Sequence, residues 1–317
     1  MHVLMLFLDG VGIGIRDPGV NPFFGARLPS LRSLFDGQLP SLRRQTLSSR
    51  NALLFPLNAT LGVAGLPQSG TGQTALFTGV NGARLIGKHF GPHPYSTLKP
   101  VLQEKNIFKL ILDAGKQPYF VNAFPQRFFE YAATPRSRLS VTTLSCMMSG
   151  VSLCRENDLS AGRAVSADIT NRGWSALSHP GVIPIDPEVA GRRLVELSGE
   201  YDFVLFEYWK TDHAGHSLKR DEAVEVLELF DRMLHGILEA VDLNTISLLI
   251  TSDHGNIEDL RTKSHTANPV PLIMVGKKIR SSRRMLSSRS DLTIVPSLIF
   301  HLLEQKLVGP QQMRENP

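Results

Sequence analysis

Cysteine is scarce in this chain of 317 residues, which contains only Cys146 and Cys154 and no C-x-x-C pair. A disulfide framework is therefore excluded as the source of stability, and the sequence is compatible with a reducing compartment. A chain of this length buries most of its surface on folding and needs no cross-links. The composition predicts a globular protein with one large domain or two smaller ones.

Long apolar runs are also absent. No run approaches the roughly 20 residues that a membrane-spanning helix needs. The N-terminal run MHVLMLFLDG has no basic region before it, and Asp9 interrupts it before it reaches the length of a signal peptide. We therefore expect a cytoplasmic protein that is neither exported nor embedded in a membrane.

Charge is dispersed along the chain, with one exception. The formal net charge of +5 and the pI of about 9.3 suit an anionic partner, either a nucleic acid or a small anionic ester. One basic cluster lies within the serine-rich residues 277–289: Lys277, Lys278, Arg280, Arg283, Arg284 and Arg289. We interpret this cluster as a solvated surface loop. Nucleic-acid binding is the alternative, and it predicts a steep dependence of binding on salt.

Short apolar runs that alternate with helical patterns indicate the fold class. The predicted strands are Val3–Leu8, Pro118–Val121, Phe203–Phe206, Ser247–Thr251 and Pro271–Val275. The predicted helical segments are Thr74–Thr78, Ile107–Ala114, Pro187–Ser198 with Asp186 as N-cap, Asp221–Val241 and Asp291–Leu303. This alternation predicts an α/β fold with a mainly parallel sheet flanked by helices. Ligands of such sheets bind beyond the carboxyl ends of the strands.

The pattern weakens between about residues 125 and 180. This segment contains six arginines, many serines and threonines, and both cysteines. We interpret it as a small cap, residues 125–180, inserted into a core formed by residues 1–124 and 181–317. Arg127 and Arg172 are candidate contacts for an anionic substrate, and a surface arginine is the alternative for each.

Aspartate and histidine cluster next to the predicted strands. The six candidate metal ligands are Asp9, Asp212, His216, Asp253, His254 and His265. Asp212 and His216 are four residues apart and can share one face of a helical turn. One aspartate or histidine at a strand end is explained by a turn, but several clusters at one sheet edge are not. Three carboxylates and three imidazoles suit two ions about 4 Å apart, and zinc or manganese better than calcium.

Ser69 is the candidate nucleophile. It lies in the glycine-rich segment QSGTGQT, where a helix is predicted to begin, so its hydroxyl would feel the positive end of the helix dipole. Coordination to a metal would lower its pKa. An N-cap serine is the alternative. Pro67 and Thr71 exclude a G-x-S-x-G elbow, and Gln73 excludes a Walker A loop.

The order of these motifs resembles a known family. Asp9-Gly10, the Ser69 segment, Asp212-x-x-x-His216, Asp253-His254-Gly255-Asn256 and Ser264-His265-Thr266 occur in one series. This series is similar to the metalloenzyme core shared by cofactor-independent phosphoglycerate mutases, phosphopentomutases and alkaline phosphatases. The resemblance spans both ends of the chain and leaves out the middle.

The resemblance implies a division of the ligands and a mechanism. One ion would be held by Asp212, His216 and His265. The other would be held by Asp9, Asp253 and His254, with Ser69 completing its shell. Ser69 would attack the phosphorus of a bound ester, and the resulting phosphoserine would pass its phosphoryl group to water or to a second hydroxyl.

Departures from the family pattern limit which activity we expect. Gln73 stands where the mutases usually have histidine, and the chain has no room for the long insert of the bacterial phosphoglycerate mutases. The residues after Ser69 lack the x-Pro-x-Arg of sulfatases. We expect a phosphoester hydrolase or phosphomutase that uses two manganese or zinc ions on a small anionic phosphoester, and no nucleic-acid partner. The alternative is a non-catalytic metal-binding interaction module with the same fold.

Overall fold

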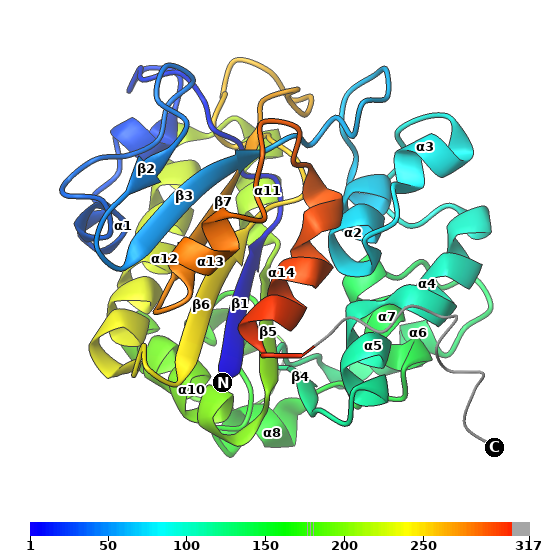
Figure 1. Ribbon diagram of the computed structural model, residues 1–317. Coiled ribbons are helices and arrows are strands. Elements are labelled where there is room, and N and C mark those ends of the chain that lie inside the picture. The colour runs from blue at the N-terminus through cyan, green and yellow to red at the C-terminus, as the bar shows by residue number, and fades with distance from the viewer. Residues whose placement is uncertain (176, 178, 180, 306–317) are drawn as a thin grey trace.

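The computed structural model describes residues 1–175, 177, 179 and 181–305 (Figure 1). Its strands are β1 (His2–Leu8), β2 (Leu47–Ser48), β3 (Ala52–Leu57), β4 (Pro118–Phe120), β5 (Phe203–Tyr208), β6 (Ile246–Thr251) and β7 (Val270–Val275). Its α-helices are α1 (Pro29–Ser33), α2 (Ser69–Thr78), α3 (Gly82–Ile86), α4 (Lys99–Lys105), α5 (Ile107–Asp113), α6 (Gln126–Ala132), α7 (Val141–Met148), α8 (Glu156–Ser160), α9 (Arg172–Ser175), α10 (Pro187–Glu200), α11 (Lys210–Ser217), α12 (Arg220–Ala240), α13 (Ile279–Arg283) and α14 (Val295–Leu302).

All strands form one sheet in the order β2-β3-β7-β6-β1-β5-β4. The neighbours β6, β1, β5 and β4 are parallel, whereas β7 runs antiparallel to both β6 and β3. The predicted α/β class with a mostly parallel sheet is confirmed, and each of the five predicted strands is present. The sequence did not predict β2 and β3. Pro56 interrupts the apolar run of β3, and proline argues against a strand interior.

The reversed direction of β7 determines which residues meet at the functional edge. The carboxyl ends of β1, β5 and β6 lie together, because Leu8 pairs with Tyr208 and Phe7 with Thr251. Since β7 is antiparallel to β6, the residues before β7 lie at this same edge. A bridge between Gly255 and Thr266 joins the loop after β6 to the loop before β7.

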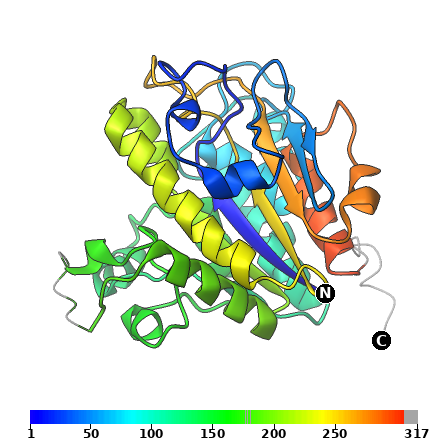
Figure 2. The same ribbon diagram turned by 90° about the vertical axis from the view of Figure 1, so that its left-hand side faces the viewer.

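Both faces of the sheet are buried, so its central strands are predominantly apolar. Leu4 and Leu6 of β1 pack with α10 and α12 on one face, while Met5 and Phe7 pack with α2 and α14 on the other. Figure 2 shows α12 lying across the first of these faces. Gly191 and Gly236 allow α10 and α12 to approach closely, because a Cβ at either would overlap the backbone of the other helix.

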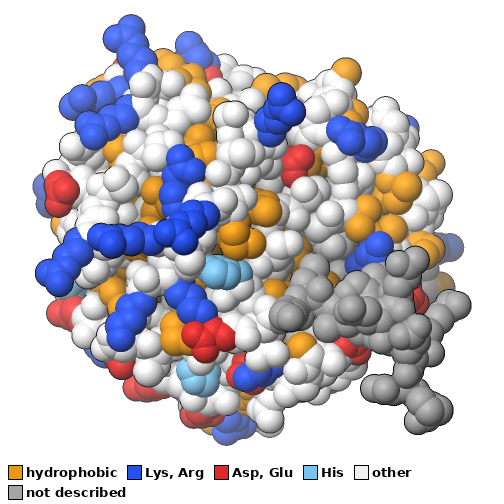
Figure 3. Space-filling view, in the orientation of Figure 1, with side chains coloured by type: hydrophobic (Ala, Val, Ile, Leu, Met, Phe, Trp, Pro, Cys, Tyr) orange, Lys and Arg blue, Asp and Glu red, His pale blue; other side chains and the backbone are white. Residues whose placement is uncertain are grey.

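The predicted helices are present with small differences at their ends. Asp186 occupies the N-cap position of α10 ahead of Pro187, but its side chain makes no capping hydrogen bond. None of the helices in the described ranges is both long and apolar enough to cross a membrane. Figure 3 shows Lys and Arg side chains gathered on the face that carries α13, where the basic cluster of residues 277–289 lies.

The segment between β4 and α10 has a small apolar cluster of its own. Its buried members are Ala123, Cys154, Leu159, Ala164, Trp174 and Val182. The helices of this segment, α6 to α9, are no longer than eight residues. Both cysteines are buried and free.

Candidate metal centre

The six predicted ligands come from three loops and one helix at the functional edge. Asp9 follows β1 directly, and Asp253 and His254 are the second and third residues after β6. Asp212 and His216 lie on α11, which begins just after β5. His265 lies in the loop before β7. Asp253 and His254 are fully buried and His265 is 9% exposed, whereas His216 is exposed, so the ligand set extends from the core to the surface.

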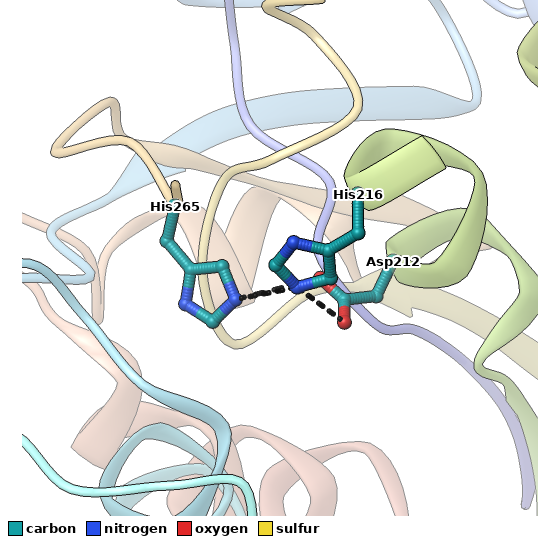
Figure 4. Close-up of side chains that lie close together, drawn as sticks. All are labelled: Asp212, His216 and His265. Carbon is teal, nitrogen blue, oxygen red and sulfur yellow. Dashed lines mark hydrogen bonds and ion pairs between the residues drawn. The ribbon is translucent and has the colours of Figure 1, made fainter. Parts of the chain in front are cut away.

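The first group of ligand atoms belongs to Asp212, His216 and His265, which lie within 4.8 Å of one another (Figure 4). His216 Nε2 is 3.2 Å from both His265 Nε2 and Asp212 Oδ2. The Nδ1 atoms of the two rings face the carbonyls of Lys263 and Pro67 at 2.7 and 2.8 Å. Because a carbonyl only accepts, each neutral ring carries its proton on Nδ1. The two Nε2 lone pairs then face each other beside a carboxylate, which suits a cation between them.

The second group comprises Asp9, Asp212 and His254. His254 Nε2 lies 3.2 Å from Asp9 Oδ1 and 3.6 Å from Asp253 Oδ2. Among the described residues, these two buried carboxylate oxygens have no hydrogen-bond partner. Buried carboxylate oxygens of this kind need a compensating charge, which a divalent cation provides. Asp212 is within reach of both groups, so the division of ligands between two ions stays a prediction.

Ser69 is the first residue of α2, and the N-cap residue is Gln68. The Ser69 hydroxyl therefore does not cap the helix; its Oγ lies 3.0 Å from His254 Nε2. Two glycines explain why the helix can start so close to the ligands. A Cβ at Gly70 would overlap the carbonyl of His93, and one at Gly72 would lie 2.8 Å from the carbonyl oxygen of Asp253.

The charges at this edge are strongly coupled without a cation. Burial raises the pKa of Asp253 well above its ordinary value, and the Asp9 carboxylate raises it further. Burial lowers the pKa of His254, but the Asp253 and Asp9 carboxylates outweigh it and raise this pKa to about 10. Burial, assisted by His254, lowers the pKa of His265 to about 4, which leaves its ring neutral and able to bind metal at neutral pH.

Glu258 ties the ligand-bearing loops together, and the sequence analysis did not identify it. Its fully buried carboxylate accepts hydrogen bonds from the backbone N–H groups of Gly12 and Asn256 at 2.9 and 2.7 Å. It also accepts from the Thr266 hydroxyl and, at 3.0 Å, from Asn268 Nδ2. The loops after β1, after β6 and before β7 are thus fixed by one side chain.

Two glycines of the motifs make room for this carboxylate. A Cβ at Gly12 or Gly255 would overlap the Glu258 side chain. The backbone N–H of Asn256 donates to Glu258, and its side-chain Nδ2 donates to Asp212 Oδ1 at 2.7 Å. Asn256 therefore orients a predicted ligand on α11. Gly12, three residues after Asp9, and Gly255, next to His254, were the signal in the sequence that a buried group lies between these loops.

A cavity of about 580 Å³ opens beside the two ligand groups. Asp9, Ser69 and Asp212 line one end of it, and residues of the 122–177 segment line much of the rest, together with Pro92, His93 and residues that follow or end β5. Arg127 is among the lining residues. Arg172 is exposed and is not among them, so its predicted contact with substrate stays a prediction.

Glu207, at the end of β5, also lines the cavity and was not predicted as a site residue. Its side chain is buried beside the metal-ligand carboxylates. Burial, followed by the charges of Asp9 and Asp253, raises the pKa of Glu207 to about 8. At neutral pH this carboxyl group is therefore mostly protonated in the metal-free protein and can donate a hydrogen bond.

Comparisons with known proteins agree with this geometry. The family model of the metalloenzyme superfamily matches residues 188–307, which include five of the six predicted ligands. The chain is 32% identical over 146 residues to the 2,3-bisphosphoglycerate-independent phosphoglycerate mutase of Yersinia pestis (strain Pestoides F). The matched segment and the shared fold support the predicted resemblance to the metalloenzymes of the alkaline phosphatase superfamily.

Solved structures show how much of this chain shares its fold with known proteins. A protein from Pyrococcus horikoshii superposes with a TM-score of 0.59 at 16% identity, covering 97% of this chain and 98% of the other. The alkaline phosphatase of the Antarctic bacterium TAB5 superposes with a TM-score of 0.55 at 13% identity, and the match covers 96% of this chain and 98% of that chain. The match to the Yersinia mutase covers 42% of this chain and only 27% of that mutase. The fold is thus shared over the whole chain, whereas the sequence similarity is confined to part of it.

Proposed function

We propose that this metalloenzyme is a two-metal phosphoryl-transfer enzyme, a phosphoester hydrolase or phosphomutase, in which Ser69 is the nucleophile. The observation that carries the proposal is the position of Ser69 Oγ. It lies 3.0 Å from His254 Nε2, at the start of α2, between the ligand groups and the cavity. A serine hydroxyl in that position can reach the phosphorus of an ester whose phosphate occupies the metal end of the cavity.

The residues that would hold the metals are those of the predicted set. Asp212, His216 and His265 would hold one ion, and Asp9, Asp253 and His254 the other with Ser69. Mixed imidazole and carboxylate donors favour zinc or manganese. Bound ions would supply positive charge that lowers the pKa of the Ser69 hydroxyl and stabilises the oxygens of the phosphoryl group.

The chain's own residues would then carry out the transfer. The bond from Ser69 Oγ to phosphorus forms as the ester P–O bond breaks, and the N-terminus of α2 favours the negative charge there. Water would release the phosphoryl group in a hydrolase, and a second substrate hydroxyl would accept it in a mutase. Residues 125–180 would act as a cap that positions the ester, with Arg127 near its charged group and Arg172 as a further candidate.

Metal analysis combined with a phosphoester assay tests this proposal. We expect two bound divalent ions per chain and turnover of an aryl phosphate that falls at least about 10³-fold in Ser69→Ala, as removal of a nucleophile does elsewhere. Ser288→Ala, an exposed serine outside the site, is the matched control and should retain full activity. Metal binding without turnover of any phosphomonoester, phosphodiester or phosphonate would instead favour the non-catalytic metal-binding module.

A further inference from the structure

The cavity beside Ser69 is much larger than a phosphoryl group requires. Its volume of about 580 Å³ lies within the range of roughly 300–1,000 Å³ that is typical of pockets for organic ligands. The end next to Ser69 and Asp212 is polar, whereas the segment of residues 122–177 contributes eight apolar side chains, three of them aromatic, beside seven polar ones. An organic group attached to the phosphate would therefore meet an apolar surface.

Aromatic rings without a free polar group form much of that surface. The Phe124 and Phe128 rings lie with centroids 4.3 Å apart, and Phe124 also packs 5.9 Å from Phe120 of the core, which fixes the pair. Trp174 is 4% exposed, and its indole N–H donates to Ser166 Oγ at 2.9 Å. With that hydrogen bond made, the Trp174 ring offers a ligand only apolar contact.

A second indole lines the cavity near the metal centre. Trp209 lies directly after β5, three residues before Asp212, and is 43% exposed. Its ring is flanked by the stacked ring of His213, with centroids 6.3 Å apart, and by Lys210 Nζ, 5.0 Å from its centroid. The chain contains two tryptophans in all, and both line this one cavity.

Two arginines in the wall of the cavity favour an anionic ligand. Arg127 and Arg138 line the cavity, and within the described part of the chain neither forms an ion pair. Asp168 also lines the cavity, but its carboxylate binds backbone groups and not an arginine. It accepts hydrogen bonds from the N–H groups of Asn171 and Gly173 at 2.9 and 2.6 Å. The two guanidinium groups are therefore free to attract a phosphoester.

We infer that the Ser69 site acts on phosphomonoesters whose alcohol part is a bulky apolar or aromatic group, which packs on Trp209 and on the Phe128 side of the cavity. A three-carbon hydroxy acid would leave these rings uncovered. The inference rests on the proposed function, since it assumes that the phosphate lies at Ser69. It assigns the rings of the 122–177 segment and Trp209 to substrate specificity.

Two esters with leaving groups of similar basicity test the inference. Ethyl phosphate and 2-phenylethyl phosphate both release a primary alkoxide, so a difference in kcat/KM reports binding of the phenyl group and not its chemistry. The metal-loaded wild-type enzyme should prefer the phenylethyl ester by at least about tenfold, the value of burying one ring. In Trp209→Ala this ratio should fall about tenfold, and in Trp209→Phe it should be largely restored.

Binding measured without turnover gives a second readout. 2-Phenylethylphosphonate should change the fluorescence of the two tryptophans at concentrations where ethylphosphonate does not. Leu112→Ala removes a side chain of similar exposure, 41%, that does not line the cavity, and it should leave the ratio of the two esters unchanged.

The outcomes separate this inference from the proposed function. Equal kcat/KM for the two esters, with turnover that depends on Ser69, would overturn the inference and leave the proposed function standing. Absence of turnover together with phosphonate binding that depends on Trp209 would overturn the proposed function and support the binding site. Equal binding of the two phosphonates would overturn the inference in either case.

Discussion

The sheet edge that carries the predicted metal ligands, called the metal edge below, and the wall of the cavity are built in opposite ways. At the metal edge, Asp253 and His254 are fully buried, and Glu258 fixes the surrounding loops through main-chain hydrogen bonds. In the cavity wall, Arg127 and Arg138 are exposed and project from short helices or loops. This difference fits the proposal that the residues at the sheet edge carry out the reaction, whereas the segment of residues 122–177 selects the ester.

The first prediction concerns substitutions on the two sides of this comparison. Asp253→Asn removes a negative charge from the buried edge, so we expect loss of one bound ion and a fall in kcat of roughly 10³-fold on every ester. Arg127→Gln should leave the metal content unchanged and raise KM by about tenfold, the value of one charged contact. Metal analysis and steady-state kinetics on both variants measure these effects. Equal effects of the two substitutions on kcat would break the comparison.

The second prediction concerns Glu258, which acts on the metals only through the loops it binds. Glu258→Gln places an amide N–H₂ where two N–H or O–H donors now point, so the loops should shift and metal affinity should fall about 10- to 100-fold. Competition with a chelator measures this affinity. Glu225→Gln, an exposed acid on α12, is the control. Unchanged affinity in Glu258→Gln would show that the loops hold their positions without this carboxylate.

The third prediction uses the pH dependence of stability in the metal-free protein. The pKa of Glu207 rises through burial from 4.5 to about 8, and that of His254 is raised from 6.5 to about 10 by Asp253 and Asp9 in spite of burial. Between pH 6.5 and 8 the folded state therefore binds more protons than the unfolded state, so its stability falls as pH rises. His265, with a pKa of about 4, is neutral in the folded state, and its protonation in the unfolded state is mostly lost just above pH 6.5, so it offsets only a small part of this fall.

Thermal unfolding across this window checks the prediction. The Tm of the metal-free protein should fall by several degrees from pH 6.5 to pH 8, and saturating Mn²⁺ or Zn²⁺ should reverse the fall, because the cation favours the ionised carboxylates. A Tm that rises with pH in the absence of metal would show that the carboxylates are not coupled as the geometry indicates.

The residues that directly follow strands could be predicted from the sequence as parts of one site, because the carboxyl ends of parallel strands meet at one edge of the sheet. Asp9, Asp212 and Asp253 were placed together on this ground, and the structure brings them together. His265 was placed at the same edge, but the reason, the reversed direction of β7, was not visible. The strand β3 was not predicted because Pro56 interrupts its apolar run, and proline argues against a strand interior.

Other parts depend on contacts between distant segments and could not be predicted. Glu258 became recognisable only when Gly12 and Gly255 were seen to enclose its carboxylate. The aromatic wall of the cavity is formed by Phe128, Trp174 and Trp209, which are far apart in sequence and follow no common pattern. The sequence of residues 125–180 therefore indicated arginines but not the apolar surface among them.

Mass spectrometry of the metal-loaded enzyme during turnover of a phosphomonoester tests the central claim most directly. After rapid acid quenching, the peptide that contains Ser69 should carry one added phosphoryl group on Ser69, and the added group should be absent in Ser69→Ala, which should also lack turnover. Continued turnover by Ser69→Ala, or a phosphoryl group trapped on a different residue, would contradict the assignment of Ser69 as the nucleophile.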